Sequence, residues 1–169
     1  MLICPNCKAE KMEKRFGDYH FTECGLDDVY LKEWPLYKCG NCDAEMPLLP
    51  DPDDFTAWLA EQLVRQESRL KGNEIFFLRK ALGLTGAKLA ERLGVQRVEV
   101  SRWENDRQPI SFHSDFQLRM EVAEQLLSPE HVAEVMQALR RYTKDIRVKT
   151  ITVESVVHRE LVREEMAVA

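Results

Sequence analysis

Two cysteine pairs with the spacing CxxC constrain the fold of this chain more than any other feature. They are CPNC at residues 4–7 and CGNC at residues 39–42. A structural zinc site takes four ligands tetrahedrally, and each CxxC turn brings two thiolates to one ion. The pattern predicts one structural Zn²⁺ held by Cys4, Cys7, Cys39 and Cys42. The 31 residues between the pairs must then form structure of their own.

Other interpretations of the cysteines are weaker. A thioredoxin-like CxxC needs a βαβ context, which the sequence lacks, and it would leave the second pair unexplained. A catalytic zinc keeps an open position and usually mixes thiolates with His or carboxylate ligands, so a closed set of four cysteines favours a structural ion. Cys24 and His20 are further possible ligands. A lone cysteine in a small domain is more often a small buried hydrophobe.

A domain boundary is predicted at PLLPDPDD, residues 47–54, where three prolines and three aspartates favour turns. Residues before it lack helical periodicity and favour short strands, whereas those after it have helical patterns. The expected fold class is α+β. The expected parts are a zinc-binding domain at 1–50, a linker helix at 51–70, an all-α domain at 71–142, and a C-terminal extension of unknown role at 143–169.

The helical patterns are interrupted at recognisable residues. Phe55, Leu59, Leu63 and Leu70 recur at helical intervals in the linker. Gly83 and Gly94 are typical helix ends, and Pro109 ends another helix. The expected helices of the all-α domain lie at about 75–82, 85–93, 96–104, 116–127 and 129–142. The extension begins with IRVKTITV, which is strand-like because it is β-branched.

A helix-turn-helix is indicated within the all-α domain. A small residue in the first helix permits close crossing, a glycine in the turn tolerates positive φ, and a β-branched residue in the second helix packs back. Ala90, Gly94 and Val100 supply these at offsets of four and six. Leu89, Leu93 and Trp103 complete the apolar seam. An ordinary helical hairpin is the simpler alternative.

The outward face of the second helix carries the candidate DNA contacts. Arginine binds guanine and phosphate bidentately, and the early residues of such a helix meet base edges. Arg97 and Arg102 are the expected main contacts, and Val98 is expected to meet a thymine methyl. The remaining candidates are Gln96 on the same face and, for phosphates, Thr85, Lys88, Arg92 and Ser101.

The net charge of the whole chain is −5, but DNA binding depends on the charge of the segment that meets the DNA. Residues 71–110 hold 8 Lys/Arg against 5 Asp/Glu, and residues 1–60 hold 6 against 12. The block with the helix-turn-helix is thus locally positive. The zinc-binding part is acidic.

The ordered combination of CPNC, GLDDVYL (25–31), CGNC and the stretch 74–106 closely resembles the MqsA-type antitoxin family. That resemblance covers about residues 1–127. It implies a zinc-binding domain joined to an Xre/Cro-like helix-turn-helix, in a homodimeric repressor of a palindromic double-stranded DNA operator. It also implies a cognate toxin protein, typically an mRNA interferase, bound by the zinc domain.

The chain departs from the family at two positions of the DNA-binding unit. Gly86 stands where members often have Gln, and Val98 stands where the best-known member has Asn, whereas Arg102 matches its Arg. A different operator sequence is therefore expected. Stand-alone regulators that sense a ligand, a metal or a redox state share this layout and are the alternative.

An enzyme is not expected. The sequence has no HExxH, no nucleophile elbow and no phosphate-cradling glycine loop, and its histidines at 20, 113, 131 and 158 form no pattern. No apolar run approaches the roughly 18 residues of a membrane span, and the N-terminus lacks the apolar run of a signal peptide. We therefore expect a cytoplasmic protein without a membrane partner.

Overall fold

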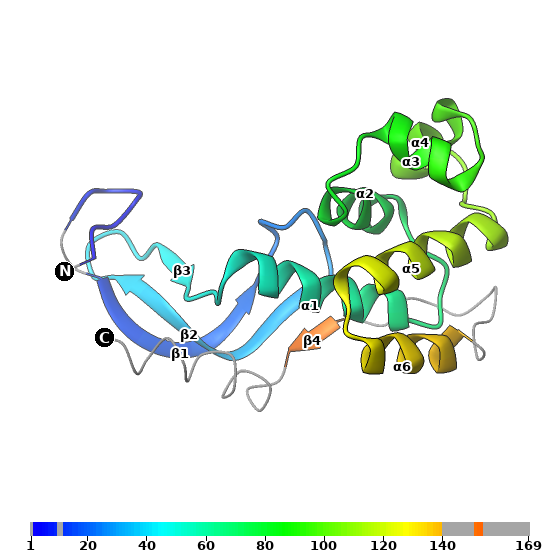
Figure 1. The fold of residues 1–169 in the computed structure, drawn as a ribbon. Helices are drawn as coiled ribbons and strands as arrows, with labels where there is room; N and C mark the ends of the chain where they lie inside the picture. The colour runs from blue at the N-terminus through cyan, green and yellow to red at the C-terminus, as the bar shows by residue number, and fades with distance from the viewer. Residues whose placement is uncertain (1, 10–11, 140–150, 154–169) are drawn as a thin grey trace. The chain divides into compact units, whose positions relative to one another are not determined.

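The computed structural model describes residues 2–9, 12–139 and 151–153. The chain forms two compact units (Figure 1). The described residues of 1–22, 27–52 and 150–169 make the first unit, and those of 23–26 and 53–149 make the second. The first is built on a β-sheet and the second on α-helices, so the predicted α+β class is confirmed.

A long antiparallel hairpin dominates the sheet of the first unit. β1 (Met12–His20) pairs with β2 (Val29–Cys39) from Met12 opposite Cys39 to His20 opposite Tyr30. The other edge of β2 pairs with the antiparallel β3 (Glu45–Pro47) and, farther along, with the parallel β4 (Ile151–Val153). β4 falls at the end of the strand-like stretch predicted in the C-terminal extension. The remainder of 143–169 lies outside the described residues.

The register of the hairpin places both cysteine pairs at one end of the sheet. CPNC precedes β1, and CGNC begins at Cys39, the last residue of β2. Because Met12 lies opposite Cys39, the two turns are brought together by strand pairing. β2 supplies buried apolar side chains: Val29, Leu31, Trp34 and Leu36.

The helical unit runs through six helices in the described residues. Their bounds are α1 (Pro52–Arg65), α2 (Gly72–Ala81), α3 (Gly86–Leu93), α4 (Arg97–Glu104), α5 (Phe112–Leu126) and α6 (Pro129–Leu139). The prediction for the first helix was wrong at its end, because Leu70 lies in the loop after α1. α5 begins before the predicted residue 116, since the Ser111 hydroxyl accepts a hydrogen bond from the Ser114 amide and caps it.

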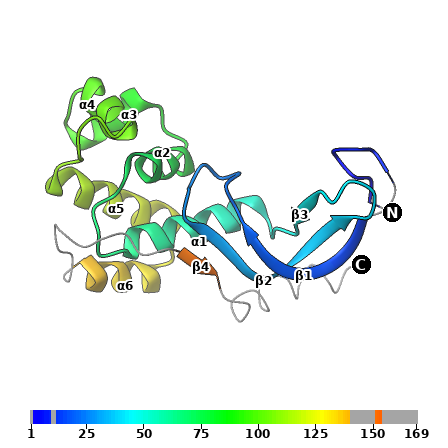
Figure 2. The ribbon, with the colours of Figure 1, turned by 180° about the vertical axis from the view of Figure 1, so that it is seen from behind.

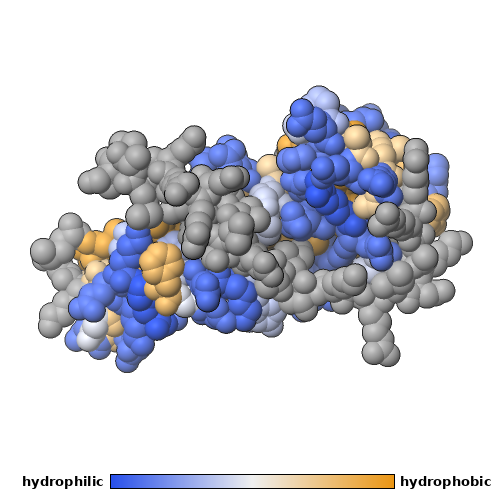
Figure 3. Space-filling view, turned by 90° about the horizontal axis from the view of Figure 1, so that it is seen from below, coloured by the Kyte–Doolittle hydropathy of each residue, from blue (hydrophilic) through white to orange (hydrophobic). Residues whose placement is uncertain are grey.

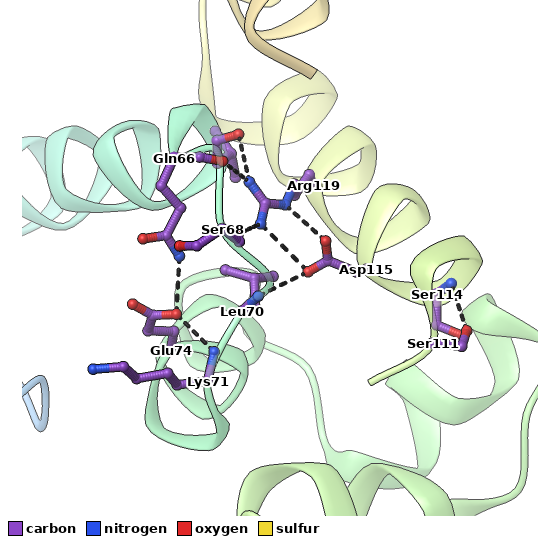
Figure 4. A network of polar contacts seen from close by, with 10 residues as sticks. Gln66, Ser68, Leu70, Lys71, Glu74, Ser111, Ser114, Asp115 and Arg119 are labelled. Carbon is purple, nitrogen blue, oxygen red and sulfur yellow. Dashed lines mark hydrogen bonds and ion pairs between the residues drawn. The ribbon is translucent and has the colours of Figure 1, made fainter. Parts of the chain in front are cut away.

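A buried arginine binds backbone carbonyls at the end of α1 and in the loop that follows. Arg119 of α5 is fully buried, and its guanidinium donates to the carbonyl oxygens of Val64 (3.2 Å), Gln66 (2.5 Å) and Ser68 (2.5 Å) (Figure 4). Asp115 balances its charge at 3.2 Å and also accepts from the amide of Leu70. Carbonyls at a helix end have no intrahelical partner, and here the guanidinium satisfies that of Val64 together with two carbonyls of the loop after α1.

The helices α2, α3 and α4 form the part of the second unit that carries the candidate DNA-binding face. Figures 1 and 2 show α3 and α4 side by side next to α2. Buried apolar side chains line this group: Ile75 and Leu78 of α2, Leu89, Ala90 and Leu93 of α3, and Val100 and Trp103 of α4. The seam predicted for the helix-turn-helix is therefore buried.

Several large apolar side chains of the described residues are exposed. Figure 3 shows one face on which hydrophilic residues predominate among the coloured atoms, with hydrophobic ones in a few small groups. The exposed large hydrophobics are Leu2, Ile3, Phe16, Phe76, Val98, Phe112 and Met136. Among the described residues, no helix has the length and apolar character to cross a bilayer.

Candidate metal centre and nucleic-acid interface

The four predicted cysteines converge on one point. Their Sγ atoms all lie within 4.8 Å of one another, with Cys4 and Cys42 at 3.7 Å and Cys7 and Cys39 at 3.6 Å. Thiolates at about 2.3 Å from a tetrahedral ion lie roughly 3.8 Å apart. The spacing of the sulfur atoms therefore fits one metal ion with four thiolate ligands.

The two cysteine turns share one backbone geometry. In the first, the amide of Lys8 donates to the carbonyl of Cys4 at 3.0 Å, and in the second the amide of Asp43 donates to the carbonyl of Cys39 at 3.2 Å. Lys8 and Asp43, each directly after a second cysteine, have φ of +61° and +57°. Left-handed backbone is uncommon outside glycine. Its occurrence at equivalent places shows that both turns close in the same way around their sulfurs.

Hydrogen-bond donors surround the sulfurs. The side-chain amide of Asn6 donates to Cys42 Sγ at 3.6 Å, and the backbone amide of Asn41 donates to Cys39 Sγ at 3.4 Å. Hydrogen bonds from the Asn41 side chain and the Ala9 amide lower the pKa of Cys7 to about 6. The pKa of Cys42 is instead raised to about 11, because burial and the neighbouring cysteine sulfurs outweigh the Ala44 amide. A thiolate, not a thiol, is the metal ligand. These donors stabilise the anionic form that a cation needs.

The other ligand candidates lie outside this cluster. Burial raises the pKa of the Cys24 thiol, which disfavours its thiolate form. The ring of His20 stacks on Tyr30 with centroids 4.4 Å apart, and its Nε2 lies 2.7 Å from the carbonyl oxygen of Asp27. Among the described residues, the four cysteines form the one group suited to a metal ion. His158 lies outside the described residues.

The turn between α3 and α4 is built as the sequence predicts. Gly94 ends α3 with φ of +64°, a left-handed conformation that glycine adopts without a steric penalty. At the other end of α3, the hydroxyl of Thr85 accepts a hydrogen bond from the Lys88 amide at 3.3 Å. At the start of α4, the Glu99 carboxylate accepts from the Gln96 amide at 3.0 Å. Each helix therefore has a defined start.

A buried ion pair holds α4 against α2. Arg79 Nε lies 2.5 Å from Glu104 Oε1, and the exposed fractions of the two side chains are 9% and 13%. The same guanidinium donates to the carbonyl of Leu84 in the turn before α3, at 2.8 Å. One side chain thus joins α2, the start of α3 and the end of α4.

A close backbone approach makes a second joint between α2 and α4. The amide of Gly72 donates to Asp106 Oδ1 at 2.8 Å. A Cβ added at Gly72 would lie 2.6 Å from the Trp103 carbonyl oxygen and 2.8 Å from that of Glu104. Only glycine fits here without displacement of the backbone. The orientation of α4 is therefore determined by several contacts outside the helix-turn-helix itself.

All eight predicted DNA contacts are exposed. They are Thr85, Lys88, Arg92, Gln96, Arg97, Val98, Ser101 and Arg102. Within the described part of the chain, Arg97 and Arg102 form no ion pair, whereas Lys88 lies 3.4 Å from Glu91 and Arg92 lies 2.8 Å from Glu121. The charge of the two α4 arginines is therefore more available than that of the two basic residues on α3.

Some residues of this region were missed by sequence reasoning. Asn105, Arg107 and Gln108 are exposed directly after α4, where a basic residue can reach a nucleic-acid backbone. The sequence signal that could have indicated Arg107 as a candidate contact was its position directly after the predicted recognition helix. Arg79 and Glu104 were not recognised as partners, because a pair 25 residues apart leaves no local pattern.

Comparison with known families supports one part of this site. Residues 75–113, from α2 to the start of α5, match the helix-turn-helix family. No curated protein and no solved structure matches the chain. The family is one of DNA-binding regulators, so the match supports a DNA-binding transcription regulator.

Proposed function

We propose that this chain is a sequence-specific transcriptional repressor that reads double-stranded DNA with α4. The observation that carries the proposal is the exposed face of α4, with Arg97 and Arg102 free of acidic partners in the described structure, inside the matched helix-turn-helix. A recognition helix places side chains against base edges in the major groove. The anchored packing of α4 supports this role, because base reading needs a fixed helix.

Different side chains are proposed to supply different parts of the binding energy. Arg97 and Arg102 read guanine edges, and Val98, with 47% of its surface exposed, meets a thymine methyl. Gln96, the N-cap of α4, lies on the same face, and Ser101, within α4, is a further phosphate contact. Thr85, Lys88 and Arg92 contact phosphates and set the register. Arg92 contributes least of these three, because Glu121 already neutralises part of its charge.

The test compares base-reading and phosphate-binding variants on DNA that the parent protein selects from a random duplex pool. Arg102→Ala should weaken binding by about 1–3 kcal/mol and relax base preference at one position, while Lys88→Ala should weaken binding to all sequences alike. Gel shifts at several salt concentrations measure both effects. Unchanged affinity in the double variant Arg97→Ala/Arg102→Ala would rule out α4 as the reading helix.

The metal centre is proposed to hold one structural Zn²⁺. Four thiolates at tetrahedral spacing suit zinc, which needs no redox chemistry and takes closed Cys₄ sites in small domains. The ion would join the two turns at the end of the β1–β2 hairpin. We propose no catalytic role for this ion.

We further propose that the protein is the antitoxin of a toxin–antitoxin pair and represses its own operon as a homodimer. The resemblance to MqsA-type antitoxins supports this, as does the acidic character of residues 1–60, with 12 Asp/Glu against 6 Lys/Arg. A toxin that binds RNA is basic, and opposite charge speeds and orients its association with an acidic partner. A homodimer matches a palindromic operator, because twofold symmetry in the protein mirrors that of the DNA.

Co-expression separates the antitoxin role from DNA binding. A neighbouring reading frame, where it encodes a small basic protein, is expressed with the parent chain or with Arg97→Ala/Arg102→Ala. Both should bind the neighbour and restore growth, while only the parent should repress the shared promoter. The antitoxin role would be contradicted if the neighbour formed no complex with the chain and the chain did not restore growth. The protein would then be a stand-alone regulator. Light scattering of the purified protein tests the dimer.

A further inference from the structure

Both cysteine turns carry asparagine at the same place, directly before the second cysteine. Asn6 belongs to CPNC and Asn41 to CGNC. The Asn6 side chain donates to Cys42 Sγ, a sulfur of the other turn, at 3.6 Å. The Asn41 side chain in return is close enough to Cys7, a sulfur of the first turn, to lower the pKa of that thiol. The two contacts are reciprocal and cross between the turns.

We propose that Asn6 and Asn41 are positioning residues of the metal centre, each tying its own turn to a sulfur of the opposite turn. This inference rests on the proposed metal centre. The direct sulfur–sulfur approaches are also crossed, Cys4 to Cys42 and Cys7 to Cys39, so the amide contacts reinforce the same pairing of turns.

The exposure of both asparagines argues against a purely structural reason for their presence. Each is exposed, so no packing constraint selects an amide at these positions. Their side-chain donors instead meet a chemical need of the site. Four thiolates around a divalent cation leave two excess negative charges, and N–H donors reduce the repulsion among the sulfurs. Residues that hydrogen-bond metal ligands orient them, and their loss typically lowers metal affinity about 10–100-fold.

Backbone amides serve both turns, and the asparagine side chains add donors that cross between the turns. The amide of Asn41 donates to Cys39 Sγ at 3.4 Å. In the first turn, the backbone amides of Cys7 and Asn6 likewise lower the pKa of Cys4. The side-chain amide of Asn6 adds a donor that the backbone of its own turn does not provide, because it reaches a sulfur of the opposite turn.

The test uses the full chain loaded with Co²⁺ or Zn²⁺. The variants are Asn6→Ala, Asn41→Ala, their combination, and the isosteric Asn6→Asp and Asn41→Asp. Each single alanine variant should release Zn²⁺ to a chelator roughly 10-fold faster than the parent, and the double variant up to about 100-fold faster. The cobalt–thiolate charge-transfer band should move to lower energy, because sulfurs without donors are more electron-rich. Glu13→Ala, an exposed change on β1, is the control and should match the parent.

The aspartate variants distinguish hydrogen bonding from shape. Aspartate keeps the size of asparagine but replaces the donor with an anionic acceptor, so it should retain metal no better than alanine. Circular dichroism of each variant checks that the helical unit is folded. If the alanine and aspartate variants match the parent in metal release rate and in the cobalt–thiolate band, the proposed role of the asparagines is overturned, while the metal centre stands. A parent chain that binds no Co²⁺ through thiolates would overturn the metal centre itself.

Discussion

Gly72 is a residue at which a single added carbon should be costly. Its Cβ would lie 2.6 Å from the carbonyl oxygen of Trp103 and 2.8 Å from that of Glu104, both backbone atoms at the end of α4. Gly72→Ala should therefore destabilise the protein by about 1–3 kcal/mol, the usual cost of overpacking. Chemical denaturation followed by tryptophan fluorescence measures this loss.

Gly86 provides the matched control for that substitution. Both glycines are the first residue of a helix, but a Cβ at Gly86 meets nothing within 4 Å. Gly86→Ala should leave stability unchanged or raise it by up to about 1 kcal/mol, because alanine has the higher helix propensity. Equal stability of the two variants would contradict the close approach of α2 and α4.

At the scale of elements, the buried pair of Arg119 and Asp115 determines how α5 meets the end of α1. Arg119→Met would remove the partner of a buried carboxylate and leave the carbonyls of Val64, Gln66 and Ser68 without a donor. Loss of one partner of a buried pair typically costs about 3–5 kcal/mol. Thermal unfolding should show this loss. Arg65→Met, which breaks the more exposed pairs with Glu61 and Glu134, should cost within about 1 kcal/mol.

Elements whose signals are local were predictable from the sequence. The predicted helices at 85–93 and 96–104 differ from α3 and α4 by only one residue at each start. They were predictable because the N-cap Thr85 and the C-cap Gly94 lie within the same short segment. The end of α1 was not predictable in this way. Arg119, which satisfies its last carbonyls, lies 55 residues beyond Val64. The orientation of α4 depends likewise on Arg79 and on Gly72, outside its own sequence.

The candidate sites show the same division. CxxC spacing predicted the four cysteines, because the ligand pattern of a zinc site lies within short turns. The length of the β1–β2 hairpin that brings those turns together was not evident, since the pairing joins residues up to 27 positions apart, from Met12 to Cys39. Which arginines remain unpaired was also beyond sequence reasoning, because Glu121 reaches Arg92 from a different helix.

At the scale of the whole molecule, metal removal should affect the two compact units differently. All four cysteines belong to the first unit, a small sheet whose two cysteine turns would share the proposed ion. Small domains bury a limited core and often need a metal, and metal binding energy is then folding energy. The helical unit has its own buried core, including Leu78, Val100 and Leu118. Chelation should therefore unfold the sheet and leave the helix-turn-helix intact.

Hydrogen exchange read by mass spectrometry tests this for each segment. After chelation, peptides from β1 and β2 should lose protection, while peptides from α2 to α4 should keep it and the protein should still shift its selected DNA. Added Zn²⁺ should restore protection in the sheet, which separates metal loss from irreversible damage. Equal loss of protection in both units would instead mean that the metal supports the DNA-binding fold, and repression would then depend directly on metal supply.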